Sequence, residues 1–172
     1  MPPPDPAMIR SAQRDRAQFA AIYEYYVQPV FRYLFSRVSN RQDAEELTAQ
    51  TFLAALESLP GYRHSGAFSA WLFSIARRKA ADHFRRQSRA GHPASPDEVE
   101  QLAAVSAQGQ LELAALIAGL PAAERELLQL RYVADLSFVE IGALLERKPD
   151  TVKKSVYRLL ARLQAEMESP NE

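Results

Sequence analysis

The sequence predicts an all-α protein with two small helical domains joined by a flexible linker. Apolar residues recur along most of the chain at the spacing of one face of an α-helix. No segment alternates apolar and polar residues in the way that a half-buried strand requires. Residues 88–110 interrupt the helical pattern with small, acidic and proline residues and hold no aromatic residue, so this stretch cannot bury much surface.

The first domain is expected over residues 15–87, after a disordered N-terminus at residues 1–14. Its first helix carries a wide apolar stripe formed by Phe19, Ile22, Tyr23, Tyr26, Val27, Val30, Phe31, Leu34, Phe35 and Val38. Pro29 should bend or divide this helix, because proline lacks an amide donor and crowds the preceding turn.

Two more helices complete this domain. Asp43 as the cap and Glu46 three residues later signal the start of the second helix, and Pro60 and Gly61 stop it. The third helix should start near Ser69, after the loop, and run into a basic segment. The apolar stripes of the three helices can bury one another as a compact helical domain.

The second domain is expected over residues 111–167. Pro121 is well placed as the first residue of a helix, and Ser137 with Glu140 forms a capping box for a short one. Pro149 opens the last helix. The buried side of that helix is expected to consist of Val152, Val156, Leu159 and Leu163.

Charge is unevenly distributed, although 21 Lys and Arg balance 21 Asp and Glu. Residues 77–89 and residues 147–162 each hold six Lys or Arg against one Asp, whereas residues 90–124 hold no Lys or Arg. The overall balance therefore hides two candidate phosphate-binding surfaces. Each basic run, taken alone, is also typical of a solvated helix face.

Several classes of function are disfavoured by composition. The chain has no cysteine, which excludes disulfides, thiolate metal sites and cysteine nucleophiles, and suits a reducing cytoplasm. His64, His83 and His92 are not paired at metal-ligand spacing, and no phosphate-binding glycine loop is present. We therefore expect no enzyme activity, metal, cofactor or small-molecule substrate. No apolar run approaches the roughly 20 residues of a membrane span and the start is unlike a signal peptide, so a cytoplasmic protein without membrane insertion is expected.

The last two predicted helices and the turn between them have the layout of a helix-turn-helix. The outer face of the last helix would carry Thr151, Lys154, Ser155, Arg158 and Arg162. Such a face suits the major groove, because lysine and arginine neutralise phosphates and donate to guanine edges. A helical hairpin that serves packing alone would show a similar pattern.

Several short motifs occur in this half of the chain: Leu120-Pro121, residues 124–132, Leu136-Ser137, Glu140-Ile141-Gly142 and Thr151-Val152-Lys153. Together they resemble domain four of bacterial sigma factors of the extracytoplasmic-function (ECF) subfamily. The resemblance implies that the helix starting at Pro149 reads the upstream, minus-35 promoter element. The residues implied in this contact are Lys148, Thr151, Lys153, Lys154, Ser155 and Arg158.

The sequence departs from the family pattern inside this module. Glu146 stands where a glycine is usual, and Asp150 where a small residue is usual. Lys154-Ser155 replaces a common serine-arginine pair, so the arginine often used for base contact is absent. Because of these changes, the sequence leaves open which bases the helix reads. Lys154 and Arg158 are the candidates to replace the absent arginine.

Residues 43–53 closely resemble the sigma domain-two signature, an acidic helix that docks on the clamp of the largest polymerase subunits. The resemblance implies a core-polymerase contact through Asp43, Glu45, Glu46, Gln50 and Thr51. Acidic residues at a helix N-terminus also stabilise the helix through its dipole, so a capping role explains their position as well.

Residues 68–86 are similar to the family's helix that captures the melted minus-10 strand, with Arg78 where asparagine is frequent. The resemblance implies that this helix and the loop at residues 61–67 bind the strand, with a flipped base in a pocket near the loop. The residues implied are Arg63, His64, Trp71, Arg77, Arg78, Lys79, His83, Arg85 and Arg86. For Trp71 taken alone, a core role is favoured over base stacking.

Together, the two resemblances imply a non-catalytic transcription initiation factor. It would bind core RNA polymerase, direct it to promoter DNA, help to melt the minus-10 region and be controlled by an anti-sigma factor. An ordinary helix-turn-helix regulator would leave the first domain without a purpose. A sigma mimic that binds an anti-sigma factor without initiating transcription would have little need for the basic segment at residues 77–89.

Overall fold

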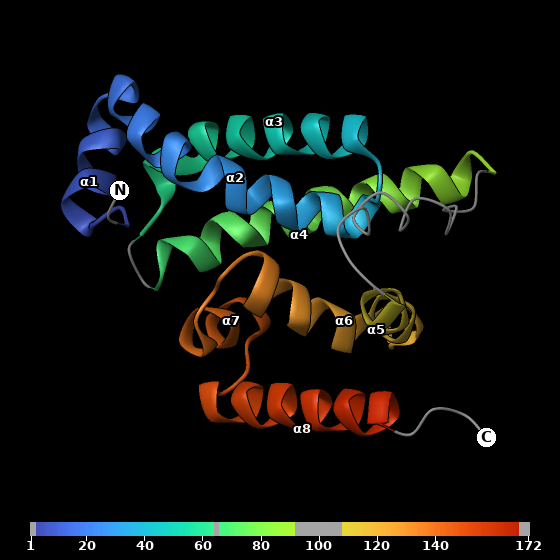
Figure 1. Cartoon of the computed structure of the whole chain (residues 1–172). Coiled ribbons are helices and arrows are strands. Elements are labelled where there is room, and N and C mark those ends of the chain that lie inside the picture. The colour runs from blue at the N-terminus through green and yellow to red at the C-terminus, as the bar shows by residue number, and fades with distance from the viewer. Residues whose placement is uncertain (1–2, 64–65, 92–107, 169–172) are drawn as a thin grey trace. The chain divides into compact units, whose positions relative to one another are not determined.

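The computed structural model describes residues 3–63, 66–91 and 108–168, and every regular element within these ranges is a helix (Figure 1). The all-α prediction is confirmed. The chain divides into two compact units, Met1–Ala94 and Ser95–Glu172. Most of the predicted linker, residues 92–107, lies outside the described residues.

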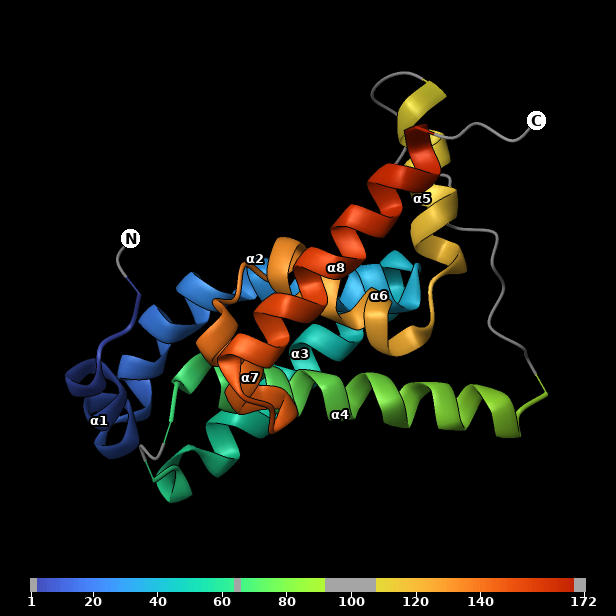
Figure 2. The same ribbon diagram turned by 90° about the horizontal axis from the view of Figure 1, so that it is seen from below.

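The first unit is built on three long helices that pack against one another (Figures 1 and 2). Its elements are α1 (Pro6–Arg14), the 3-10 turn η1 (Arg16–Gln18), α2 (Phe19–Val38), α3 (Arg41–Ser58), the 3-10 turn η2 (Leu59–Gly61) and α4 (Phe68–Arg89). Side chains from α2, α3 and α4 form the core, which includes Ile22, Tyr33, Leu34, Leu47, Leu72 and Phe73. Each such large apolar side chain contributes about 1.5–3 kcal/mol by leaving water. The helix α2 continues through Pro29 and is not divided there.

The N-terminus differs from the expected disorder over residues 1–14, because Pro6–Arg14 forms α1. Asp5 caps this helix by accepting a hydrogen bond from the Met8 amide at 2.8 Å. Ile9 and Ala12 lie on one face of α1 and are 3% and 2% exposed. An apolar stripe this short gives little periodicity in the sequence, and the helix gains its stability from packing on the rest of the unit.

The start of α3 also differs from the prediction. Asn40 is the N-cap, and its side-chain oxygen accepts a hydrogen bond from the Asp43 amide at 2.9 Å. The prediction that Asp43 is the cap was therefore wrong, because Asp43 lies within the first turn. Its carboxylate still lies at the positive end of the helix dipole, where a negative charge is favoured.

The second unit consists of shorter helices that lead into one long helix. Its elements are α5 (Gln108–Gly119), α6 (Ala122–Leu128), the π-helical turn η4 (Gln129–Val133), α7 (Phe138–Leu145) and α8 (Pro149–Glu168). The four predicted buried residues of α8 are confirmed, with Val152 and Val156 completely buried. The predicted capping box is also present, since the Ser137 amide donates to the Glu140 carboxylate and the Glu140 amide donates to the Ser137 hydroxyl. Within the described ranges, none of the helices combines the length and the apolar composition that a membrane span requires.

Candidate nucleic-acid interface

The second unit contains a helix-turn-helix formed by α7, α8 and the turn at residues 146–148. Glu146 ends α7 in the left-handed region, with φ of +54°. The amide of Arg147 donates to the Gly142 carbonyl at 2.9 Å, which closes the turn onto α7. A Cβ atom at Gly142 would lie 2.6 Å from the Arg147 carbonyl oxygen. The turn can therefore approach α7 this closely only because residue 142 has no side chain.

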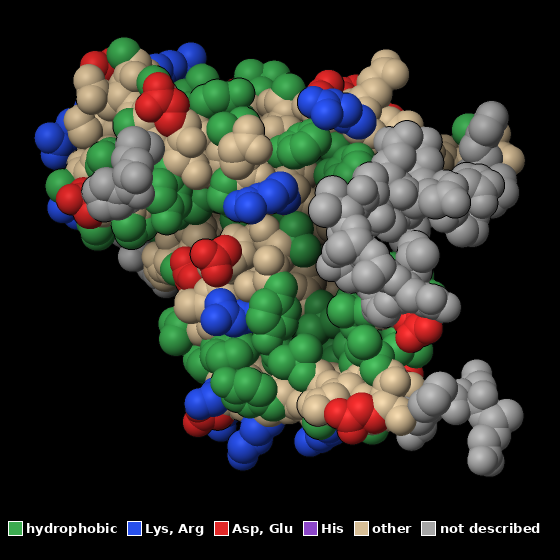
Figure 3. All heavy atoms as spheres, viewed as in Figure 1, with side chains coloured by type: hydrophobic (Ala, Val, Ile, Leu, Met, Phe, Trp, Pro, Cys, Tyr) green, Lys and Arg blue, Asp and Glu red, His purple; other side chains and the backbone are tan. Residues whose placement is uncertain are grey.

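The outer face of α8 is cationic. Thr151, Lys153, Lys154 and Arg158 are exposed, as is Lys148 in the turn. Figure 3 shows Lys and Arg side chains along the α8 edge of this unit, at the bottom of the view. The structure therefore leaves five of the six residues implied in the minus-35 contact accessible to solvent. The sixth, Ser155, is half-buried on the side of α8 that faces α6.

A shallow concavity of about 240 Å³ lies between α6 and α8. It is lined by Ala123, Glu124, Leu127, Arg147, Ser155, Arg158, Leu159 and Arg162. Within it, the Arg147 guanidinium donates a hydrogen bond from Nη2 to the Ser155 hydroxyl oxygen at 2.9 Å. Sequence reasoning did not place Arg147 in the candidate site, although the residue opens the second basic segment.

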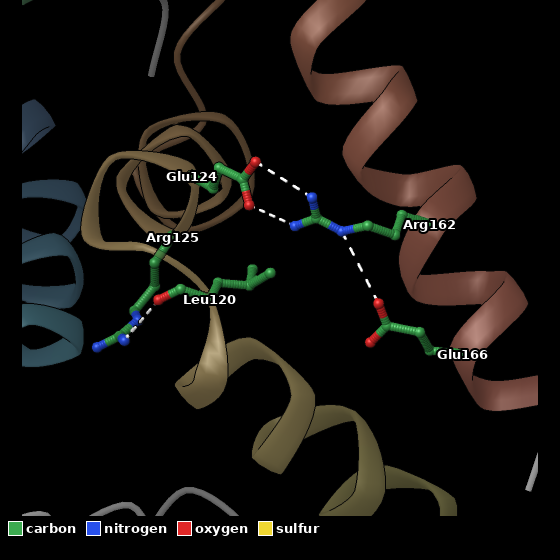
Figure 4. Close-up of polar contacts among 5 residues, drawn as sticks. All are labelled: Leu120, Glu124, Arg125, Arg162 and Glu166. Carbon is green, nitrogen blue, oxygen red and sulfur yellow. Dashed lines mark hydrogen bonds and ion pairs between the residues drawn. The ribbon is translucent and has the colours of Figure 1, made fainter. Parts of the chain in front are cut away.

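Arg162 has a different environment from the other cations of α8 (Figure 4). Its guanidinium makes a two-pronged contact with the Glu124 carboxylate of α6 and lies 3.8 Å from a Glu166 oxygen. The hydrogen bond from Arg162 to Glu124 raises the pKa of the guanidinium. Two carboxylates thus surround Arg162, which braces α8 against α6 and offers less free charge to an anion.

In the first unit, the start of α3 is acidic and exposed. The Arg41 guanidinium lies 2.8 Å from the Glu45 carboxylate, and both side chains face solvent. Asp43 is half-buried, and its carboxylate lies 3.5 Å from the His83 ring of α4. Asp43 therefore connects the acidic end of α3 to the neighbouring helix.

The next turns of α3 show which predicted contact residues reach the surface. Gln50 donates to the exposed Glu46 carboxylate at 2.8 Å. Thr51 is completely buried, and its hydroxyl donates to the Leu47 carbonyl at 2.7 Å. Leu53 is 58% exposed beside this polar row. The structure thus brings the acidic residues and Gln50 to one surface and turns Thr51 into the core.

The two sides of α4 differ in chemistry. Arg77, Arg78, Arg85 and Arg86 are exposed. The α3-facing side contains buried Ala76 and Ala80 and continues to His83, which therefore lies away from the exposed arginines. Lys79 is half-buried in a concavity of about 440 Å³ that Arg78 and Asp82 also line.

The loop before α4 is held by aromatic contacts. The Tyr62 hydroxyl donates to the Gly66 carbonyl at 2.9 Å. The ring centroid of Tyr62 lies 5.0 Å from Trp71 and 5.4 Å from Phe68, and burial raises the pKa of the Tyr62 phenol. Trp71 is half-buried, in keeping with a packing role. Arg63 is exposed, and His64 lies outside the described residues.

Gln13 of α1 fixes the chain that enters this loop. Its side-chain amide donates to the Leu59 carbonyl at 3.0 Å and to the Tyr62 carbonyl at 2.8 Å. A sequence pattern cannot reveal this link, because the partners are backbone atoms 46 and 49 residues away. In the part of the chain that the structure describes, no group of three or more His, Asp and Glu residues could hold a metal ion.

Two helical units, the second with a cationic helix-turn-helix, define a DNA-binding protein. The family models support a narrower assignment: Sigma-70 region 2 matches residues 22–90, and Sigma-70, region 4 matches residues 110–163. Together with ECF sigma factors that are 30% and 32% identical over most of their own length, these models show that the chain belongs to the ECF sigma factors of the sigma-70 family. It is a non-catalytic factor that directs RNA polymerase to promoters, which confirms the prediction from the sequence.

Similar curated proteins agree with this assignment. ECF RNA polymerase sigma factor SigM of Bacillus subtilis is 30% identical over 151 residues, which cover 84% of this chain and 91% of SigM. ShbA of Streptomyces griseus is 32% identical over 180 residues, which cover 92% of this chain and 93% of ShbA. BldN of Streptomyces coelicolor is 32% identical over 91% of this chain, which spans only 63% of BldN.

Solved structures show the same fold. CnrH in complex with the cytosolic domain of CnrY gives a TM-score of 0.70 at 21% identity, over 96% of this chain and 97% of CnrH. RpoE of Bartonella quintana in complex with the anti-sigma factor NepR gives a TM-score of 0.65 at 20% identity, over 89% of this chain and 98% of RpoE.

Proposed function

We propose that the two units divide promoter recognition between them. Residues 15–87 bind core RNA polymerase and the minus-10 strand, and residues 111–167 bind the minus-35 element. The observation that carries this proposal is that α4 and α8 each present a row of exposed cations in a chain with no net charge. Placing two separate basic faces on two units suits a protein that holds one DNA molecule at two places.

The polymerase contact is assigned to the acidic end of α3. Asp43, Glu45, Glu46 and Gln50 reach its surface, and exposed Leu53 adds apolar area beside them. A basic partner surface would be steered by these carboxylates and held by the apolar contact. Thr51 would contribute indirectly by stabilising α3, because its buried hydroxyl donates a hydrogen bond to the backbone of that helix.

The minus-10 contact is assigned to the exposed arginines of α4 and the loop before it. Guanidinium groups along the helix would follow the phosphates of a single strand, and the loop would receive an unstacked base. The surface contributors are Arg63, Arg77, Arg78, Lys79, Arg85 and Arg86. Trp71 would support the loop through Tyr62, and His83 would support α3 through Asp43.

The minus-35 contact is assigned to the outer face of α8. Thr151 lies in the first turn of the helix, where a recognition helix meets base edges. Lys148, Lys153, Lys154 and Arg158 extend the cationic surface along the turn and the helix. Ser155 contributes indirectly, through its hydrogen bond with Arg147.

An anti-sigma factor is the proposed regulatory partner. Two proteins that share this fold were solved with a bound partner. RpoE was solved with the anti-sigma factor NepR, and CnrH with the cytosolic domain of CnrY. On this chain, Tyr23 and Leu53 are 44% and 58% exposed in the first unit, and Tyr132, Val139 and Tyr157 are 56%, 64% and 53% exposed in the second. Each unit therefore has more than one large apolar side chain that a protein could cover.

Run-off transcription with core RNA polymerase and a genomic promoter library tests the proposal. Core enzyme with the full chain should initiate at a defined subset of promoters, and core enzyme alone should not. A regulator or a sigma mimic would give no promoter-specific initiation at any promoter in the library. Binding to core enzyme without initiation would then identify a sigma mimic. Binding to duplex DNA in the absence of core enzyme would identify a regulator.

A further inference from the structure

We propose that Arg147 is a specificity-determining residue, which donates to a base edge in the major groove beside Arg158. This inference rests on the proposed minus-35 role of the second unit. Arg147 belongs to the turn before α8 and not to the recognition helix itself. It therefore adds a reading group that the outer face of α8 does not contain.

The geometry brings Arg147 to the recognition helix. Its guanidinium is bonded to Ser155, which lies in the second turn of α8, and both residues line the concavity with Arg158. Arg158 is also part of the exposed face of α8, so the concavity borders the surface assigned to DNA. Arg147 is itself exposed and can be reached by a base edge at that border.

The charge on Arg147 is available to DNA. The partner of its guanidinium is a neutral hydroxyl, whereas the Arg162 guanidinium is surrounded by two carboxylates. Within residues 108–168, the structure shows no ion pair for Arg147 or Arg158. These two arginines are therefore the uncompensated cations of the concavity.

The hydrogen bond with Ser155 also suits base reading. A guanidinium has five N–H donors in a rigid fork, so a bond to one hydroxyl leaves a pair free for the O6 and N7 atoms of guanine. A side chain already held in place loses less conformational entropy when it binds. A phosphate contact needs only the positive charge, whereas a base contact needs this fixed orientation.

The test uses holoenzyme assembled from core RNA polymerase and the full chain. The probe is a duplex promoter whose upstream region is randomised, and bound duplexes are sequenced. Wild type is compared with R147A, R147K and S155A, and R10A removes an exposed charge from α1 as a matched control. Circular dichroism establishes that each variant keeps the wild-type helix content.

We expect R147A and R147K both to lose about 10- to 100-fold of the preference at one or two base pairs. S155A should lose part of the same preference at unchanged net charge, and R10A should keep all of it. Unaltered preferences in R147A would overturn the inference. So would a uniform loss across sequences in R147A that R147K restores, because that result identifies a phosphate contact. If wild type itself enriches no upstream sequence, the proposed minus-35 role fails, and the inference fails with it.

Discussion

Two residues, one inside α7 and one at the start of the turn that follows it, explain how this helix-turn-helix is shaped. Gly142 lets the Arg147 carbonyl approach the backbone of α7, and Glu146 turns the chain in the left-handed region. The family pattern noted above has its usual glycine at the Glu146 position. In this chain, the position that requires glycine is Gly142, inside α7. The left-handed position in the turn is instead occupied by Glu146, whose Cβ makes that backbone conformation strained.

Replacing Glu146 with glycine should stabilise the second unit by about 0.5–1 kcal/mol. The left-handed backbone costs a residue with a Cβ about 1–2 kcal/mol, and the greater freedom of glycine in the unfolded chain offsets part of that gain. Urea unfolding of wild type and E146G measures the difference. A lower midpoint for E146G would show that the Glu146 side chain makes a stabilising contact that outweighs the strain.

Replacing Gly142 with alanine should destabilise the second unit by about 1–3 kcal/mol, because the added Cβ overlaps a backbone carbonyl that must move. Gly119 at the end of α5 is a matched control, since a Cβ there meets nothing within 4 Å. The same unfolding experiment should show no such loss for G119A. Equal stability of G142A and wild type would mean that the turn shifts freely, and the close approach would then have no energetic role.

The interactions between elements are harder to predict than the elements themselves. Periodic apolar residues predict the long helices α2, α3, α4 and α8, because a wide stripe repeats over several turns. The short helix α1 was missed, since Ile9 and Ala12 alone define its buried face. The Asn40 cap was missed because Asp43 gives an equally good signal three residues later.

In the candidate site, too, contacts between distant residues are harder to predict than the helices that carry them. Sequence reasoning identified the cations of α8, because exposed charge and buried apolar residues alternate at helical spacing along it. It did not find Gln13 or Arg147, whose partners are a distant backbone and a hydroxyl eight residues away. It also placed Thr51 and His83 on contact surfaces, whereas the structure shows one buried and the other facing α3.

The link from α1 to the loop can be tested through Gln13. Q13A removes two hydrogen bonds, each worth about 0.5–1.5 kcal/mol, although the Leu59 carbonyl keeps the bond that it accepts from the Tyr62 amide. We expect faster hydrogen exchange at residues 59–62 and slower promoter melting by permanganate footprinting. Q28A, at an exposed glutamine of α2, is the control. Unchanged exchange in Q13A would show that α1 does not hold the loop.

The acidic end of α3 can be tested by replacing Asp43, Glu45 and Glu46 with alanine together. The affinity for core polymerase should fall at least about 10-fold, because the exposed Glu45 and Glu46 carboxylates and the partly exposed Asp43 carboxylate steer and hold a basic partner. Helix content should persist because Asn40 still caps the helix. Fluorescence anisotropy of labelled protein with core enzyme measures the affinity, with E24A on α2 as the control. Equal affinity of the triple variant and wild type would remove these residues from the contact.

At the scale of the whole molecule, the net charge is zero, but the charged side chains are not evenly distributed. The chain carries 21 basic and 21 acidic side chains, and its exposed cations include a row on α4 in one unit and a row on α8 in the other. A protein of this kind has little long-range attraction to DNA from its net charge. Binding must instead come from local phosphate contacts on each unit, and these contacts release counterions.

The salt dependence of holoenzyme binding to a promoter should therefore separate into two parts. Removing Lys154 and Arg158 should make the slope of log K against log salt shallower by about 1.8, because each duplex phosphate contact contributes about 0.9. Removing Arg78 and Arg86 should reduce it by about 1.4, because each single-strand contact contributes about 0.7. In the variant that lacks all four cations, the two reductions in slope should add, because the two pairs lie on different units. Filter binding over a salt series measures the slopes, with R10A as the control. A slope that stays at the wild-type value for either pair would show that its face does not touch DNA, and would leave promoter binding to the other unit alone.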